Sequence, residues 1–141
     1  MLRGYLSNFG EVELIELRPS DESRNFFIQC RRALKKVRAK IETVNFDLSG
    51  YDLICFGSPV WAFAPAPSLN TYLDNCRGIE NKKIVLFTTY GSGSGNQKCL
   101  DYMQGLLSLK GVKDFQQFSL QQMKIRNREF VLAKIKESLP L

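Results

Sequence analysis

The sequence contains no histidine, the side chain that most often acts as a general base near neutral pH. Nucleophilic sites that pair serine or cysteine with histidine are therefore excluded. The four cysteines (Cys30, Cys55, Cys76 and Cys99) form no CxxC pair, and without histidine they complete no zinc-binding set. We interpret them as ordinary buried thiols and predict no metal site and no catalytic side chain. Any redox chemistry would then belong to a bound cofactor.

Long apolar runs are also missing. No stretch approaches the roughly 18 apolar residues of a membrane-spanning helix, and the N-terminus lacks the pattern of a secretion signal. We therefore expect a soluble, cytoplasmic protein without a membrane partner. Its 141 residues, 44% of them hydrophobic, match a single domain covering residues 1–141.

The chain carries a formal net charge of +6, and its basic residues concentrate in residues 31–40. Apolar residues recur at helical spacing between them, which is typical of an amphipathic helix with a solvated basic face, here residues 26–40. Because no nucleic-acid-binding motif accompanies the charge, we predict no nucleic-acid partner. A basic face would also attract an acidic redox partner, which the sequence does not name.

Periodicity predicts the remaining elements. Apolar residues at helical spacing predict helices in residues 1–9, 67–76 and 99–107 and from residue 126 onward. Residues 53–56 and 84–87 are uninterrupted apolar segments, typical of strands buried on both faces, and residues 115–120 form a weaker strand. Residues 11–17 alternate charged and apolar side chains, which predicts a strand at a sheet edge. Strands that alternate with helices indicate an α/β fold with a mostly parallel sheet.

Two loops follow the two most buried strands. Residues 57–63 contain the only tryptophan, Trp61, and residues 88–95 have glycine at every second position from Gly91. Ligands of open parallel sheets bind beyond the carboxyl ends of the strands, and glycine lets the backbone approach them closely. The loops therefore favour a flat aromatic ligand, although a flexible Gly/Ser linker has the same composition.

The motifs in residues 51–61 (YDLICFGSPVW), 64–67 (APAP) and 82–89 (KKIVLFTT), with the glycine-rich loop that follows, resemble the flavodoxin family. The resemblance is strong from Asp47 to Gly95 and looser beyond. It implies a flavodoxin-like three-layer sandwich with FMN as cofactor, its isoalloxazine ring lying between the two loops. The implied cofactor-binding residues are Ser58, Pro59, Val60, Trp61, Ala62, Thr89, Tyr90, Gly91, Ser92, Gly93 and Gly95.

The sequence departs from the family at its start. A flavodoxin opens with a central strand and a phosphate-binding loop at a helix N-terminus, whereas residues 1–9 here correspond to the end of the helix that follows that loop. We therefore expect an N-terminally truncated sandwich of about four strands and an incomplete FMN site. Three arrangements would fill the gap in the sheet: residues 11–17 lie beside 53–57, a homodimer completes the sheet, or the protein begins upstream of Met1.

The function expected from these observations is FMN-dependent electron transfer. A flavin-free interaction or dimerisation module is the first alternative, with Trp61, Phe63 and Tyr90 as an exposed apolar patch for a partner. An NAD(P)H-dependent flavin reductase is the second, since the family contains such oxidoreductases.

Overall fold

The computed structural model describes residues 1–20, 28, 31, 35, 38–91 and 93–140. In chain order, its elements are α1 (Leu2–Leu6), β1 (Leu53–Trp61), β2 (Ala64–Pro65), α3 (Pro67–Asn75), β3 (Lys83–Tyr90), α4 (Asn96–Ser108), β4 (Asp114–Gln121), the 3-10 turn η1 (Gln122–Lys124) and α5 (Arg128–Ser138). Most of the helix predicted over residues 26–40 lies outside the described residues.

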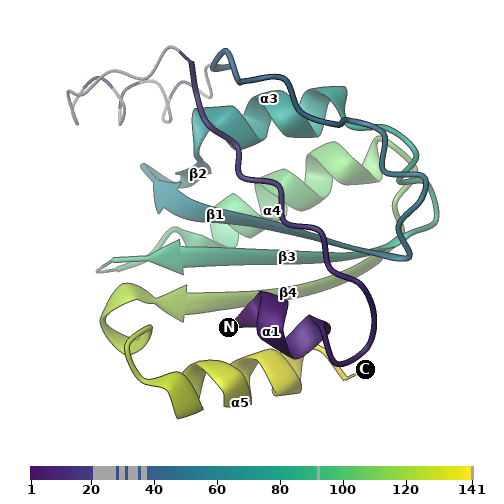
Figure 1. Cartoon of the computed structure of the whole chain (residues 1–141). Coiled ribbons are helices and arrows are strands. Elements are labelled where there is room, and N and C mark those ends of the chain that lie inside the picture. The colour runs from purple at the N-terminus through teal and green to yellow at the C-terminus, as the bar shows by residue number, and fades with distance from the viewer. Residues whose placement is uncertain (21–27, 29–30, 32–34, 36–37, 92, 141) are drawn as a thin grey trace.

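The strands form one sheet in the order β2-β1-β3-β4 (Figure 1). β1, β3 and β4 are parallel, with Leu53 opposite Lys83 and Lys83 opposite Asp114. β2 turns back from β1 and pairs with it antiparallel. The predicted α/β fold with a mostly parallel, four-stranded sheet is confirmed, and the short strand β2 is the element that periodicity did not predict.

Helices cover both faces of the sheet, which gives three layers. Ile54, Phe56, Ile84 and Leu86 pack with the buried side chains of α3 and α4 in one apolar cluster. Val85 and its neighbours in β4 pack with α5 in a second cluster, against which the partly buried side chains of α1 also pack. Because successive residues of a strand point to opposite faces, one unbroken apolar run in β3 supplies both clusters.

The helix ends follow local chemistry. Proline stands at the start of α3, where its missing N–H costs no helical hydrogen bond. Asn127 caps α5, its side-chain oxygen accepting a 3.0 Å hydrogen bond from the Phe130 N–H. Gly111, with a φ of 85°, lets the chain turn after α4. These signals explain why α3, α4 and α5 lie close to their predicted positions.

The strand predicted in residues 11–17 is wrong: this segment forms neither helix nor strand. Figure 1 shows it crossing in front of β3 and β1 toward α3. Its glutamates Glu11, Glu13 and Glu16 are exposed, and Leu14 is 69% exposed. Paired inside the sheet, the segment would place charge on both of its faces, which disfavours burial beside β1. The predicted first helix also ends early, at Leu6.

Two expected absences can be examined in the described part of the chain. None of its helices is long and apolar enough to cross a membrane. The cysteine and acidic side chains of the described residues form no group of three or more that could hold a metal ion.

Candidate functional site

A tight hairpin ends β1. Trp61 pairs with Ala64, so only Ala62 and Phe63 make the turn, and their φ angles are 48° and 67°. Positive φ at both central positions is the geometry that suits the twist of a two-residue hairpin, but it normally selects Asn and Gly. Each ordinary residue held there costs about 1–2 kcal/mol. The hairpin therefore stores strain while it presents an aromatic ring at the end of the sheet.

A small pocket lies between this hairpin and the loop after β3. We call it the loop pocket; its volume is about 170 Å³, and it is lined by Val60, Ala62, Phe63, Tyr90, Gly91, Gly93, Ser94 and Asn96. Both predicted loops contribute, although they follow different strands. β1 and β3 are adjacent and parallel, so their carboxyl ends meet at one edge of the sheet, as expected for a ligand site.

Phe63 closes one side of the loop pocket against the start of α4. A Cβ atom on Gly95 would lie 2.5 Å from the Phe63 ring, so a side chain there would displace the ring, and the φ of 139° also favours glycine. The Lys98 ammonium lies 5.4 Å from the centre of the same ring, within the range of a cation–π interaction. The ring is nonetheless 50% exposed. The Phe63 ring therefore packs against Gly95 and lies near Lys98, while half of the residue stays exposed to solvent.

A hydrogen-bonded chain fixes the floor of the loop pocket. The Asn96 amide donates to the Ser119 hydroxyl at 3.0 Å, and that hydroxyl lies 3.1 Å from the buried hydroxyl of Thr88. These residues come from α4, β4 and β3, so three elements hold one another at the carboxyl end of the sheet. Hydrogen bonds that join several elements in this way hold the residues of a site in position.

The Ser58 hydroxyl makes hydrogen bonds within the protein and does not face a ligand site. Its hydroxyl accepts a 2.9 Å hydrogen bond from the Ala66 N–H and donates a 2.8 Å bond to the Pro59 carbonyl, and the residue is 4% exposed. The hydroxyl therefore ties the end of β1 to the residue that caps α3.

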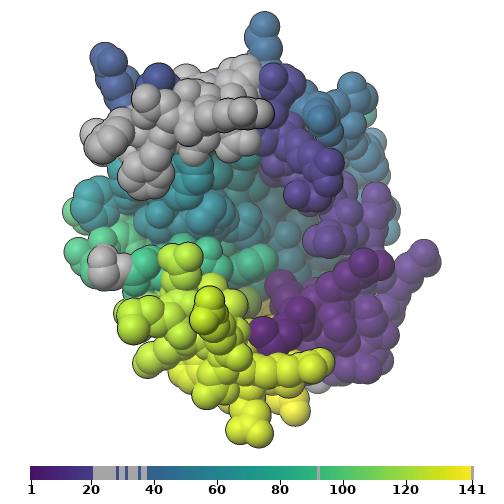
Figure 2. Space-filling model, turned by 60° about the vertical axis from the view of Figure 1, so that its left-hand side comes forward, coloured from purple at the N-terminus to yellow at the C-terminus, as the bar shows by residue number. Residues whose placement is uncertain are grey.

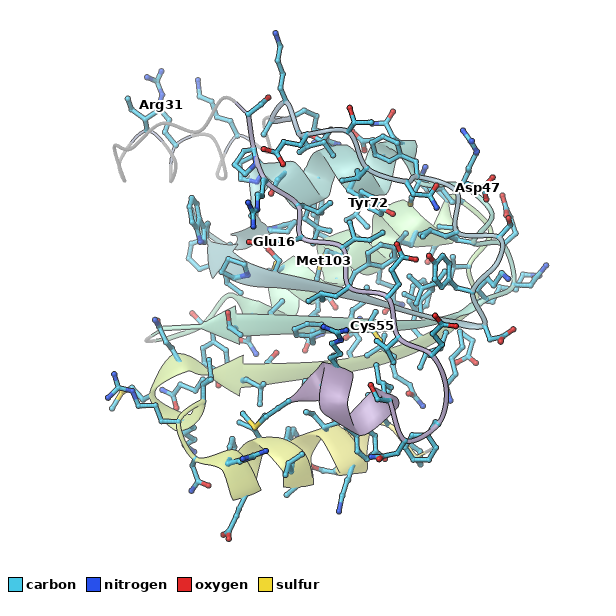
Figure 3. The ribbon with its side chains drawn as sticks, viewed as in Figure 1. Glu16, Arg31, Asp47, Cys55, Tyr72 and Met103 are labelled. Atoms are coloured by element: carbon cyan, nitrogen blue, oxygen red, sulfur yellow. The ribbon has the colours of Figure 1, made fainter. Side chains whose placement is uncertain are left out.

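A second, much larger cavity lies along β1. We call it the edge cavity; its volume is about 930 Å³, and its lining includes Ser58, Pro59 and Trp61. Figure 3 shows three further lining residues, Cys55 of β1, Tyr72 of α3 and Glu16 of the N-terminal segment. Val60 lines the loop pocket, whereas its neighbours Pro59 and Trp61 line the edge cavity.

The structure thus divides the predicted site residues. Val60, Ala62, Tyr90, Gly91 and Gly93 meet at the loop pocket. Ser58, Pro59 and Trp61 line the edge cavity, and Thr89 and Gly95 line neither. Ser92 lies outside the described residues. Their role in cofactor binding stays a prediction.

Ser94 lies within the predicted loop of residues 88–95, whereas the prediction missed Asn96 in the lining of the loop pocket. A signal for Asn96 was present: it follows Gly95 at the start of a predicted helix, a place where Asn often meets other backbone and side-chain groups.

The two cavities differ in the ionisable side chains that line them. Tyr90 is the single ionisable side chain among the residues lining the loop pocket. In the edge cavity, burial raises the pKa of the Cys55 thiol to about 11, so this thiol stays protonated at neutral pH. A neutral thiol is a poor nucleophile. The loop pocket offers apolar and backbone contacts to a ligand, whereas the lining of the edge cavity also contains charged side chains (Arg3, Glu13, Glu16, Arg18 and Glu42).

Comparisons with known proteins agree with the fold. A crystal structure of a protein from Bacteroides eggerthii described as a flavoprotein shares 18% identity, covering 94% of this chain and 86% of its own, with a TM-score of 0.61. A second, from Bacteroides uniformis and similarly described, shares 14% identity over 93% of this chain and 88% of its own, with a TM-score of 0.63. No curated protein sequence matches the chain.

The comparison with family models establishes family membership as well as fold, because it compares the sequence itself. The flavodoxin family profile matches residues 23–127, a span that contains β1, β3, β4 and both loops of the loop pocket. The match covers well over half of the chain, and the three-layer fold agrees with it. The chain belongs to the flavodoxin family.

Proposed function

We propose that this chain binds the isoalloxazine ring of FMN at the loop pocket and serves as an electron-transfer protein. Membership of the flavodoxin family implies a flavin cofactor. The observation that carries the proposal is the meeting of both predicted loops around one pocket, where Tyr90 and Phe63 supply aromatic surface and Gly91 and Gly93 leave the backbone accessible.

The loop pocket is large enough for part of FMN only. About 170 Å³ is less than the roughly 300–1,000 Å³ of a pocket that encloses a whole small molecule. The loop pocket therefore suits the edge of a flat ring better than an entire nucleotide. When bound, the flavin would supply the electron-accepting and electron-donating chemistry.

The chain's own residues would bind and orient the ring. Val60 and Phe63 would exclude water from one side, and the glycines of the second loop would let backbone amides approach the ring polar edge. No side chain is assigned a proton-transfer role. When bound, the flavin would supply the electron exchange with a partner protein.

The test is a titration of FMN with the purified protein, followed by flavin fluorescence. Saturable quenching at micromolar FMN is the expected result. A Tyr90→Ala variant should weaken binding because it removes aromatic lining from the pocket. A Phe130→Ala variant is the matched control, since Phe130 is a partly exposed aromatic residue on α5 that lines neither cavity.

Two outcomes would contradict the proposal: a folded protein that leaves flavin fluorescence unchanged, or a loss of binding that is equal in the Tyr90 and Phe130 variants. Riboflavin in place of FMN separates the contribution of the ring from that of the phosphate.

A further inference from the structure

Three loops meet at the carboxyl end of the sheet, because β1, β3 and β4 are parallel. They are the hairpin after β1, the loop after β3 and the segment made by η1 and the start of α5. The second and third approach each other: a Cβ atom on Gly91 would lie 4.0 Å from Oε1 of Gln122. Figure 2, in which this end of the sheet comes forward, shows η1 and the start of α5 in yellow-green on the surface. We call this surface, formed by the described residues of 61–66, 90–99 and 121–130, the loop face.

The loop face exposes apolar side chains. Met123 of η1 is 85% exposed, Phe63 of the hairpin is 50% exposed and Phe130 of α5 is 37% exposed. Single exposed apolar residues are normal on a protein surface, but these share one end of the molecule with the loop pocket. Methionine and aromatic residues are also enriched in protein–protein interfaces. The loop face therefore has the apolar component of a surface that contacts a partner.

The same loops carry four basic side chains and one acidic side chain. The basic residues are Lys98, Lys124, Arg126 and Arg128, and the acidic residue is Glu129. All of them are exposed. None of the four cations makes an ion pair with another residue that the structure describes. The loop face is therefore positively charged, and its cations are free to meet an external anion.

The amino end of the sheet has a different balance of charge. Its loops, residues 45–53, 76–83 and 109–114, contain five basic and four acidic residues. Some of these cations also have partners within the protein: Lys82 and Lys110 each donate a 2.7 Å hydrogen bond to a backbone carbonyl. Positive charge is thus nearly balanced at the amino end and unbalanced at the loop face.

The aromatic rings of the loop face favour an acidic protein over a single-stranded nucleic acid. The Lys98 ammonium lies 5.4 Å from the centre of the Phe63 ring. The Lys124 ammonium lies 5.2 Å from the centre of the Phe130 ring. Nucleic-acid bases bind such surfaces by stacking on aromatic faces, and stacking here would first displace a cation–π contact. Carboxylates of a protein can pair with both lysines where they are, while its apolar side chains contact Met123.

We propose that the loop face is the docking surface for an acidic partner protein. The partner places carboxylates against the four cations and apolar side chains against the exposed methionine and phenylalanines. Opposite charge steers the encounter and sets the orientation, and apolar contact adds affinity. The assignment of a redox partner rests on the proposed electron-transfer function, because a protein docked on the loop face lies beside the loop pocket.

The probe is a small acidic iron–sulfur ferredoxin, a soluble redox protein with a negative surface. It is titrated into the flavin-free chain, and the backbone amide signals are followed by NMR. We expect saturable shifts or broadening confined to residues 61–66, 90–99 and 121–130, with a Kd of about 100 μM or lower at about 20 mM ionic strength. Binding should weaken at least about tenfold at about 200 mM, because salt screens exposed charges. A basic cytochrome c is the control protein and should produce no such changes.

The double variant Lys124→Glu/Arg126→Glu tests the loop face from the protein side. It should weaken ferredoxin binding about tenfold or more, since it replaces attraction with repulsion. Lys113→Glu/Lys136→Glu is the matched control: it changes the net charge equally, at exposed positions just before β4 and near the end of α5, remote from the loop face (Figure 1). None of these four residues lines the loop pocket, so both variants should bind riboflavin as the wild type does. Circular dichroism verifies that both are folded.

Three results would overturn the proposal. The ferredoxin leaves the spectrum of the folded protein unchanged, the affected amides lie outside the loop face, or the two double variants bind the ferredoxin equally. Tighter binding of a mixed-sequence RNA oligonucleotide than of the ferredoxin at the same residues would also overturn it and would assign the loop face to nucleic acid. Because the titrations are made without flavin, a failure of FMN binding would leave them unchanged, and a failure of docking would leave riboflavin binding unchanged. The two proposals therefore fail separately.

Discussion

Gly57 shows how one residue without a side chain shapes the centre of the sheet. A Cβ atom at this position would lie 2.0 Å from Cζ of Phe87, because the ring of Phe87 covers the glycine from the neighbouring strand. That ring stacks on Phe118 with centroids 5.4 Å apart, so β1, β3 and β4 are connected across one face. The glycine makes room for an aromatic pair.

Replacing Gly57 with alanine should destabilise the fold by about 1–3 kcal/mol, the usual cost of forcing extra atoms into a packed site. Urea unfolding of the variant and the wild type measures this difference. Gly105→Ala is the control: no heavy atom lies within 4 Å of a Cβ there, and the residue is inside α4. That change should raise stability by about 0.5–1 kcal/mol. Equal effects at the two glycines would contradict the packing argument.

The sequence patterns located the segments that form this site, but they did not predict which contacts the individual residues make. Gly57 was expected as part of a turn, whereas the structure places it inside β1, beneath Phe87. Ser58 was expected to face a ligand, and its hydroxyl is instead used by Ala66 and Pro59. Such contacts depend on which side chain of a neighbouring strand lies opposite, and local sequence does not contain that information.

At the scale of elements, the hairpin of β1 and β2 is the clearest departure from local preference. Ala62 and Phe63 occupy left-handed conformations that Asn and Gly adopt more easily. No turn signal marks these residues, which explains why β2 was not predicted. The packing of Phe63 on Gly95 and Lys98 holds the turn in place.

Ala62→Gly should therefore stabilise the protein by up to about 1 kcal/mol, since relief of the left-handed strain, about 1–2 kcal/mol, exceeds the added freedom of the unfolded chain. Thermal unfolding is the measurement. Ala133→Gly, at an exposed position inside α5, should lower stability by about 1 kcal/mol. If both variants lose stability, the turn is not strained.

Helices α3, α4 and α5 and the strands β1, β3 and β4 were predictable because each combines strong periodicity with clear end signals. The strand prediction for residues 11–17 was wrong because alternation of charged and apolar residues produces a strand only when the edge of a neighbouring strand is available for pairing. Here the segment forms no strand, and pairing beside β1 would bury glutamates that are exposed in the structure.

At the scale of the whole molecule, the buried ionisable groups set the behaviour at high pH. Burial raises the pKa of Cys99 to about 12, that of Cys55 to about 11 and that of Tyr72 to about 12. Each group is neutral when protonated, and its pKa in the unfolded chain is lower. The folded protein therefore keeps these protons longer than the unfolded chain does, and ionisation favours unfolding.

Stability should accordingly be unaffected by these groups below about pH 8 and should fall as the pH rises from about 9 toward 12, through the folded-state pKa values. Urea unfolding at pH 8 and at pH 10–11 measures the fall. A Cys99→Ala variant should lose less stability over the same interval, because one titrating thiol is gone. A stability that stays constant to pH 11 would show that these thiols are not protected by the fold.

Tyr5 and Leu139 join the two ends of the described chain. The Tyr5 hydroxyl donates a 3.2 Å hydrogen bond to the Leu139 carbonyl across a separation of 134 residues, and α1 contacts α5 beside it. At a synthesis rate of roughly 5–20 residues per second, Tyr5 is synthesised about 7–27 s before Leu139. The apolar face of β1, β3 and β4 against which α1 and α5 pack therefore stays exposed until α5 has been synthesised.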